Sequence, residues 1–238
     1  MSLWTQLELD PDRHRTVALV GGGGKTTLLY ALAREARAAG RTVIVTTTTH
    51  MFPHPRLTVT GCAEVSRLRE LTARHGIVML GVPGREGKLS AAGTAAACMQ
   101  AADLVLIEAD GAKRLPLKAP ADYEPVIPPQ AAAVIAVAGA DCVGRPIRSV
   151  CHRPERVCAL LGKPPQATVE PEDAALLLAS PLGGRKGTAP HMAFRCAVNK
   201  ADLAPRAAQE IQALLCARGI PTLTTSFTEE ERGGLCWF

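Results

Sequence analysis

The chain has 238 residues, 47% of them hydrophobic and 21% charged, which is enough to bury a full core in one domain. Its formal charge of +5 is scattered without a block of like charges, so the sequence does not indicate nucleic-acid binding or a membrane-surface patch. It contains no apolar run of the ~18 residues that a membrane helix needs, and its N-terminal stretch has no apolar signal core. We therefore expect a cytoplasmic protein.

The eight cysteines form no C-x-x-C pair, the spacing typical of a zinc or redox site. Several lie inside apolar segments, such as Cys98, Cys196 and Cys216. We expect them to be buried free thiols that behave as small hydrophobic side chains.

Residues 16–27, TVALVGGGGKTT, predict a strand, a glycine loop and the start of a helix over 26–38. Such a helix N-terminus binds anions, because its unpaired amides and its dipole both favour negative charge. Glycine lets the backbone turn with positive φ and approach phosphate oxygens. We expect Lys25 to reach the β- and γ-phosphates and the Thr26 hydroxyl to bind Mg²⁺. The expected nucleotide-binding residues of this loop are Gly21, Gly22, Gly23, Gly24, Lys25, Thr26 and Thr27.

The loop departs from the pattern G-x-x-x-x-G-K-[ST], because Leu19 stands where the first glycine belongs. The remaining GGGGKTT resembles the GG-x-GKTT core of the deviant phosphate loops of SIMIBI-class NTPases. That class has a lysine near the start of the loop, where this chain has Val20. The alternative interpretation is a glycine-rich turn without a ligand.

Residues 41–46 predict a buried parallel strand that runs into the segment TTTTHM. Open α/β sheets form their ligand crevice at the carboxyl ends of the strands. One interpretation assigns the hydroxyls of Thr47, Thr48 and Thr49, with His50, to Mg²⁺, a γ-phosphate or a second substrate. The other is a strand end that enters a proline-containing loop. Further on, the pattern predicts strands over 57–60 and 76–80, and helices over 63–74 and 88–102.

Residues 104–107 predict another buried strand, which delivers Glu108 and Asp110 to its carboxyl end, with Gly111 next. A carboxylate in this place, beside a phosphate loop, is suited to bind Mg²⁺ or to position a water molecule. The basic residues that follow, Lys113, Arg114 and Lys118, leave open an ordinary solvated loop.

The last informative segment is a strand that begins at Ala193 and ends in Asn199-Lys200-Ala201-Asp202. Asn-Lys-x-Asp is the guanine-reading motif of GTPases: the Asp carboxylate accepts from N1–H and the 2-amino group, and the Lys stem covers the base. Adenine has an acceptor at N1, so we expect GTP rather than ATP. The neighbouring elements expected are a strand over 131–138, helices over 153–161, 170–179 and 205–218, and a strand over 220–226.

The order of phosphate loop, threonine segment, E-x-x-G (Glu108 to Gly111) and N-K-x-D resembles the metallochaperone GTPases of urease, hydrogenase and cobalamin-enzyme maturation. The chain is more similar to the YqeC-type family, regarded as accessory proteins of selenium-dependent hydroxylases. The segments that carry this resemblance are GGGGKTT, TTTTHM, IEADGAKRLPLKAP, EPVIP, HRPE and VNKAD. It implies a cytosolic accessory NTPase that helps to mature a selenium-dependent molybdenum hydroxylase.

These patterns together predict a three-layer α/β P-loop NTPase fold, with a mainly parallel sheet flanked by helices. We expect one domain over 1–238, with a less regular insertion around 142–192. The leading hypothesis is a slow, partner-dependent GTPase with Mg²⁺ as cofactor. Lys25 neutralises developing phosphate charge, Thr26 with Glu108 or Asp110 holds Mg²⁺, and one of the two acids orients the attacking water.

An anionic substrate or a partner's carboxylates are expected to bind Lys113, Arg114, Lys118 and Arg153. The partner is a client apo-enzyme or a cofactor-biosynthesis protein, and a homodimer is left open. Two alternatives remain. One is a phosphoryl or nucleotidyl transferase that acts on a small cofactor precursor, and the other is a non-catalytic binding module gated by nucleotide.

Overall fold

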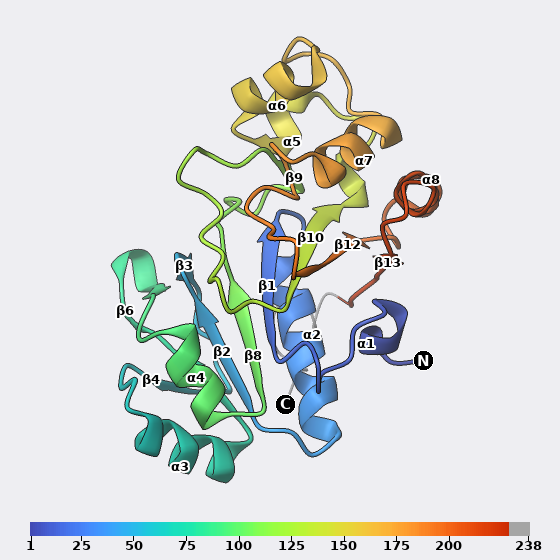
Figure 1. Cartoon of the computed structure of the whole chain (residues 1–238). Helices are drawn as coiled ribbons and strands as arrows, with labels where there is room; N and C mark the ends of the chain where they lie inside the picture. Colours follow the sequence, from blue (N-terminus) through green and yellow to red (C-terminus); the bar gives the residue numbers. More distant parts are fainter. Residues whose placement is uncertain (229–238) are drawn as a thin grey trace.

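The computed structural model describes residues 1–228, and an eight-stranded parallel sheet forms their middle layer (Figure 1). The strand order is β13-β12-β10-β1-β8-β2-β5-β4. The strands are β1 (Thr16–Gly21), β2 (Val43–Thr47), β4 (Thr58–Thr60), β5 (Ile77–Leu80), β8 (Leu104–Glu108), β10 (Ala133–Gly139), β12 (Ala193–Asn199) and β13 (Thr222–Thr224).

Two small sheets lie outside the large one. The first joins β3 (His50–Met51), β7 (Leu89–Ser90) and β6 (Val82–Pro83), and the second joins β9 (Leu117–Lys118) to β11 (Cys151–His152). The α-helices are α1 (Leu3–Gln6), α2 (Lys25–Ala38), α3 (Val65–His75), α4 (Ala95–Ala101), α5 (Ile147–Val150), α6 (Pro154–Leu161), α7 (Pro171–Ala179) and α8 (Pro205–Cys216). Short 3₁₀ helices cover Arg85–Gly87 and Ala140–Cys142.

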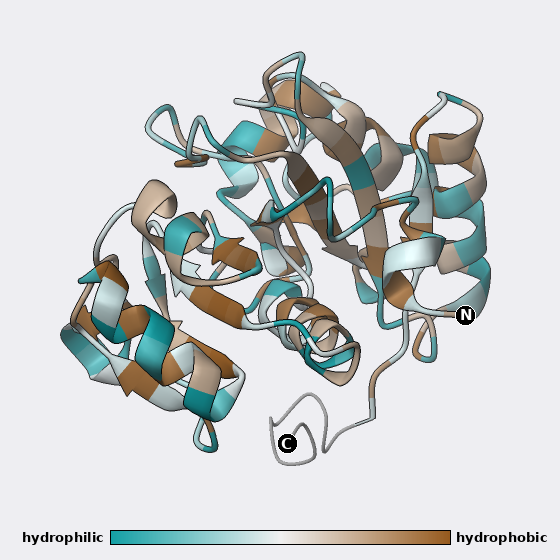
Figure 2. Ribbon diagram, turned by 60° about the horizontal axis from the view of Figure 1, so that its bottom comes forward, coloured by the Kyte–Doolittle hydropathy of each residue, from teal (hydrophilic) through white to brown (hydrophobic). Residues whose placement is uncertain are grey.

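Successive side chains of the strands enter different cores, as the two faces of a sheet require. On β1, Val17 and Leu19 pack with α1 and α2, whereas Ala18 and Val20 pack with α7 and α8 on the other face. A third core joins β2, β8, α3 and α4. The brown strands between partly teal helices in Figure 2 show the same layering. The predicted three-layer α/β fold with a parallel sheet is therefore confirmed.

The prediction of a helix over 88–102 is wrong in its first half. Leu89 and Ser90 pair with β3 and β6 as a strand, and α4 begins only at Ala95. The helix starts there because the Thr94 hydroxyl accepts from the Ala97 amide as an N-cap. The short helix α1, which the sequence did not predict, packs Trp4 against α2, with its indole donating to Leu32 O.

The expected insertion around 142–192 contains α5, α6 and α7, which stand above the carboxyl ends of the strands in Figure 1. Its two expected helices are α6 and α7. Helix α7 begins with Pro171 and has a capping box between Glu170 and Asp173.

Burial of the cysteines follows the prediction only in part. Cys98, Cys142, Cys151 and Cys196 are buried, but Cys216 is exposed because it lies on the outer face of α8, and Cys62 is exposed too. Burial raises the pKa of the Cys151 thiol to about 12. Cys236 lies outside the described residues.

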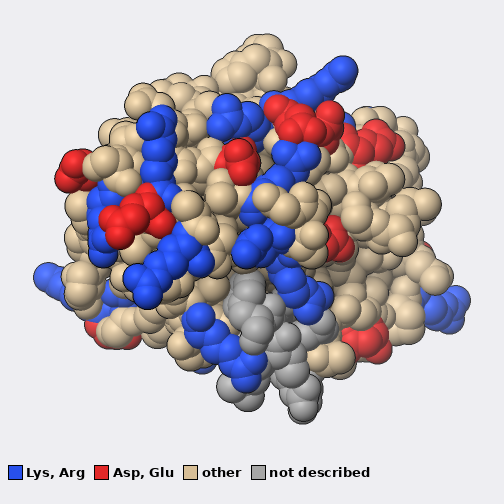
Figure 3. Space-filling model, turned by 90° about the horizontal axis from the view of Figure 1, so that it is seen from below, with Lys and Arg blue, Asp and Glu red and all other residues tan. Residues whose placement is uncertain are grey.

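On the face where the strands begin, charges of both signs are mixed (Figure 3). Figure 3 shows Lys and Arg side chains with Asp and Glu between them on the face below the sheet, where the strands begin. Within residues 1–228, no helix is long and apolar enough to cross a membrane.

Candidate functional site

The carboxyl ends of the central strands bring the predicted site segments to one edge of the sheet. Glu108 at the end of β8 pairs with Leu19 on β1 and with Thr47 on β2. On the other side of β1, Asn199 of β12 pairs with Gly139 of β10. The glycine loop, the first acid, the threonine segment and the N-K-x-D segment are therefore neighbours.

The glycine loop leads from β1 directly into the N-terminus of α2. In the part of the chain that the structure describes, the amides of Lys25, Thr26 and Thr27 donate to no acceptor, whereas Leu28 N donates to Gly24 O. The amides of Gly22 and Gly23 are already occupied, by Val137 O at 2.8 Å and Leu115 O at 3.0 Å. The unpaired amides beside the glycine loop are thus those of the first turn of α2.

Gly22 has a role that the sequence did not show. A Cβ added there would lie 2.6 Å from Leu115 O and 3.1 Å from Pro116 C, so only glycine lets this segment approach. Gly23 has a φ of +71°, and a Cβ there would collide with the backbone of Gly139. The glycines of the loop are thus needed for close packing of the protein itself.

Lys25 is 5% exposed, and its ammonium donates to Gly21 O at 2.6 Å and pairs with Asp110 Oδ1 at 3.1 Å. Burial lowers the pKa of Lys25, but the carboxylates of Asp110 and Glu108 outweigh it and leave this pKa raised. Asp110 also accepts from the Gly21 amide at 3.0 Å. Asp110 therefore fixes both the loop and its lysine.

Thr26 and Glu108 meet at the start of α2, where the threonine hydroxyl donates to Glu108 Oε2 at 2.6 Å. Burial raises the pKa of Glu108, while Lys25 and the Thr26 hydroxyl lower it in part. Hydroxyl and carboxylate oxygens are hard ligands that suit Mg²⁺, and neighbouring ligands of an octahedral ion at about 2.1 Å lie about 3 Å apart. This oxygen pair therefore fits Mg²⁺ without a large movement.

The threonine segment is tied to Glu108 through its backbone. Thr47 Oγ1 donates to Glu108 O at 2.8 Å, and Thr49 N donates back to Thr47 Oγ1 at 3.0 Å. Thr48 Oγ1 donates to Val126 O at 2.8 Å, and exposed His50 contacts Ser90 Oγ at 3.1 Å. The hydroxyls of Thr47 and Thr48 are therefore occupied by carbonyls, and Thr49 Oγ1 lies 3.4 Å from Thr47 Oγ1.

The N-K-x-D segment contacts the glycine loop through its asparagine. Asn199 Nδ2 donates to Gly23 O at 3.0 Å, and Asn199 Oδ1 accepts from Lys200 N and from Thr225 Oγ1. Lys200 has a φ of +60° and pairs with Asp141 Oδ2 at 2.8 Å, and Asp202 is exposed. Asn199 thus acts as a support of the loop in this structure.

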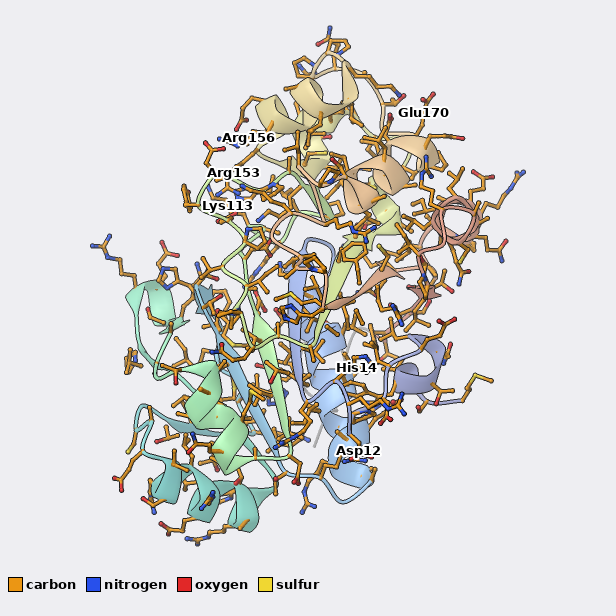
Figure 4. The ribbon with its side chains drawn as sticks, in the orientation of Figure 1. Asp12, His14, Lys113, Arg153, Arg156 and Glu170 are labelled. Atoms are coloured by element: carbon orange, nitrogen blue, oxygen red, sulfur yellow. The ribbon has the colours of Figure 1, made fainter. Side chains whose placement is uncertain are left out.

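A basic rim borders the same edge of the sheet. Lys113 and Arg114 form the tip of a turn closed by Leu115 N and Ala112 O, and both have positive φ, +48° and +62°. Non-glycine residues in that region store strain of about 1–3 kcal/mol each, which is found mostly where function needs it. Arg114 stacks on the ring of Phe52, 5.2 Å from its centroid, and Phe52 is 44% exposed. Figure 4 shows Lys113 beside Arg153 above the sheet.

The fourth basic residue of the predicted substrate group, Lys118, is buried behind this rim. It is 5% exposed and pairs with Asp110 Oδ2 at 2.9 Å and Glu124 Oε2 at 2.8 Å. Arg153, at the N-cap of α6, holds the same Glu124 through both guanidinium nitrogens at 2.8 and 3.1 Å. Lys118 thus lies inside the protein, whereas Lys113 and Arg114 face outward.

Three polar residues of this region were not singled out from the sequence. Asp141 follows β10 in the way that Glu108 ends β8, so its place after a buried strand was a usable signal. Thr225 follows β13 directly, so its place after a strand was a similar signal for its contact with Asn199. Glu124 follows no strand pattern, and nothing local marks its contact with Lys118.

The fold and this edge define an α/β protein with a glycine loop and a helix N-terminus with unpaired amides, beside a carboxylate–hydroxyl pair. A family model described as "YqeC protein" matches residues 17–155. "Uncharacterized protein YqeC" of Escherichia coli (strain K12) is 36% identical over 182 residues, which cover 73% of this chain and 71% of that protein. The chain belongs to the YqeC family. No solved structure matches it.

Proposed function

We propose that this chain is a nucleotide-binding accessory protein that binds GTP with Mg²⁺ and hydrolyses it slowly. The observation that carries the proposal is the first turn of α2, whose unpaired amides lie beside Lys25 and the Thr26–Glu108 pair. Such a site suits phosphate groups, because the amides, the helix dipole and a lysine all attract negative charge.

The chain's own residues take distinct roles in this proposal. Lys25 leaves Gly21 O and Asp110 to contact the β- and γ-phosphates, and stabilises the charge that develops in the transition state. Thr26 and Glu108 hold Mg²⁺, which supplies further charge neutralisation when bound. Asp110, saturated by an amide and two lysines, serves better to position the loop than to bind the metal ion. Guanine is read by Asp202, with Asn199 bracing the loop.

The accessory role extends the family relation. The proposed client, a selenium-dependent molybdenum hydroxylase, is what the resemblance to the YqeC-type family implies. The basic rim with Lys113 and Arg114 supports a partner or substrate that carries negative charge.

A second candidate is a transferase, favoured by the strained turn at Lys113 and Arg114 beside the phosphate loop. In this alternative the rim binds an anionic acceptor that takes a phosphoryl or nucleotidyl group. Thr49 and His50 lie on the same edge and would contact that acceptor.

A single-turnover assay with γ-labelled GTP tests the proposal. Release of labelled phosphate supports hydrolysis, and label on a small acceptor supports the transferase. Intact GTP that remains bound supports a nucleotide-gated module. A Lys25→Met variant serves as the control and is expected to lose the reaction. Absence of GTP binding by the wild-type protein contradicts the proposal.

A further inference from the structure

A chain of five charged side chains runs from the phosphate loop to the helical insertion. Lys25 pairs with Asp110 at 3.1 Å, Asp110 with Lys118 at 2.9 Å, Lys118 with Glu124 at 2.8 Å, and Glu124 with Arg153 at 2.8 Å. Lys25 is the first residue of α2, the next three members come from the segment after β8, and Arg153 is the N-cap of α6.

The signs of these charges alternate, and water has little access to them. The side chains of Lys25, Asp110 and Lys118 are at most 5% exposed, and exposure rises to 10% at Glu124 and 17% at Arg153. Charges interact strongly in such an interior, because neither solvent nor salt screens them well. Each inner charge therefore has two partners of opposite sign, and losing one partner strengthens its attraction to the other.

We propose that Lys118 and Glu124 are positioning residues that set how tightly Asp110 holds Lys25, and thereby the affinity of the loop for nucleotide phosphates. This inference rests on the proposed function. Lys118 neutralises Asp110 from the side opposite to Lys25, so that Lys25 can leave Asp110 for a phosphate. Glu124 acts one step earlier, because it competes with Asp110 for Lys118.

The alternation predicts effects of opposite sign. Without Lys118, Asp110 has only Lys25 as its cation and holds it more firmly, so Lys118→Met weakens GTP binding about tenfold. Without the Glu124 charge, Lys118 pairs with Asp110 alone and Lys25 is released, so Glu124→Gln tightens binding about threefold. Lys118→Arg keeps the charge and restores most of the affinity.

The double variant separates this coupling from a simple change in net charge. Glu124 acts on the loop only through Lys118, so Glu124→Gln has no effect on affinity once Lys118 is Met. If instead the two charges act independently through space, the two effects add and the double variant returns toward wild-type affinity.

The test is equilibrium titration of the full-length protein with labelled GTP and Mg²⁺, at low and high salt. The matched control is Asp122→Asn, which breaks the exposed pair between Asp122, two residues before Glu124, and Arg156 of helix α6. It removes one negative charge and is expected to leave GTP affinity unchanged. Unfolding by urea shows which variants remain folded.

If Lys118→Met does not fold, Arg153→Gln provides a second cycle at the outer end. It frees Glu124 to draw Lys118 from Asp110, so it weakens binding, and it has no effect when Glu124 is Gln. Opposite signs with non-additive double variants support the inference. Equal effects of Glu124→Gln in both backgrounds, or an equal effect of Asp122→Asn, overturn it while the proposed function stands. A wild-type protein that binds no GTP overturns the proposed function, and this inference with it.

Discussion

Asp202 carries the base specificity in the proposed function. Its carboxylate accepts two donors from guanine, and an amide in its place instead offers a donor to the 2-oxo group of xanthine. We expect Asp202→Asn to reverse the preference from GTP to XTP by at least about tenfold, measured by competition binding. Glu210→Gln, an exposed acid on α8, is the control and keeps the GTP preference. An Asp202→Asn protein that still prefers GTP shows that this residue does not read the base.

Ionisation of Glu124 makes the free energy of unfolding depend on pH in the acid range. Burial raises its pKa, but the hydrogen bonds from Lys118 and Arg153 outweigh burial and leave the pKa below the ordinary value of 4.5. Its contribution to stability is therefore complete above pH 4.5 and is lost as the pH falls through the lowered folded value. We expect Glu124→Gln to flatten the loss of unfolding free energy below pH 4.5, measured by urea titration at several pH values. An unchanged acid profile would mean that this ion pair is not formed in solution.

The 115–116 segment packs directly against the glycine loop, so the stability of the protein depends on the lack of a side chain at Gly22. Gly22→Ala places a Cβ 2.6 Å from Leu115 O, so we expect a loss of about 1–3 kcal/mol in the free energy of unfolding. Gly111→Ala is the matched control, since a Cβ there meets nothing within 4 Å, and its effect stays within about 0.5 kcal/mol. Equal losses in the two variants refute the close approach of the 115–116 segment.

Regular elements with a strong pattern were predictable from the sequence. The buried strands such as β1, β8 and β10 are continuous apolar runs, and helix α2 follows its glycine loop with a clear apolar face. The start of α4 was not predictable, because pairing of Leu89 and Ser90 with β3 and β6 overrode an alanine-rich helical pattern.

The positions of the candidate site residues at strand ends followed from the same rule, because parallel strands gather their carboxyl ends at one edge. The residues that contact these side chains could not be predicted in this way. In the sequence, Lys118 is one of several basic residues in an expected loop. Only the fold shows that it is buried between Asp110 and Glu124. Likewise the bond from Asn199 to Gly23 joins residues 176 positions apart.

At the scale of the whole molecule, the cores that cover the two faces of the sheet bury four of the seven cysteines within residues 1–228. Burial raises the pKa of the Cys98 thiol to about 11 and also raises that of Cys142. Thiolates are the reactive form, so we expect iodoacetamide to modify exposed Cys62 and Cys216 first, and the buried thiols only after unfolding. Peptide mapping by mass spectrometry measures this, and rapid modification of Cys142 would contradict the packing of α7 and α8 on the sheet.

In the molecule as a whole, one edge of a parallel sheet brings together a glycine loop, an acid–hydroxyl pair, an N-K-x-D segment and a basic rim. The central claim is that this edge binds GTP. The most direct measurement is equilibrium binding of labelled GTP and ATP to the wild-type protein and to Lys25→Met, each with and without Mg²⁺. We predict Mg²⁺-dependent binding of GTP in preference to ATP, lost in Lys25→Met. Absence of binding, or equal binding by Lys25→Met, would contradict the claim.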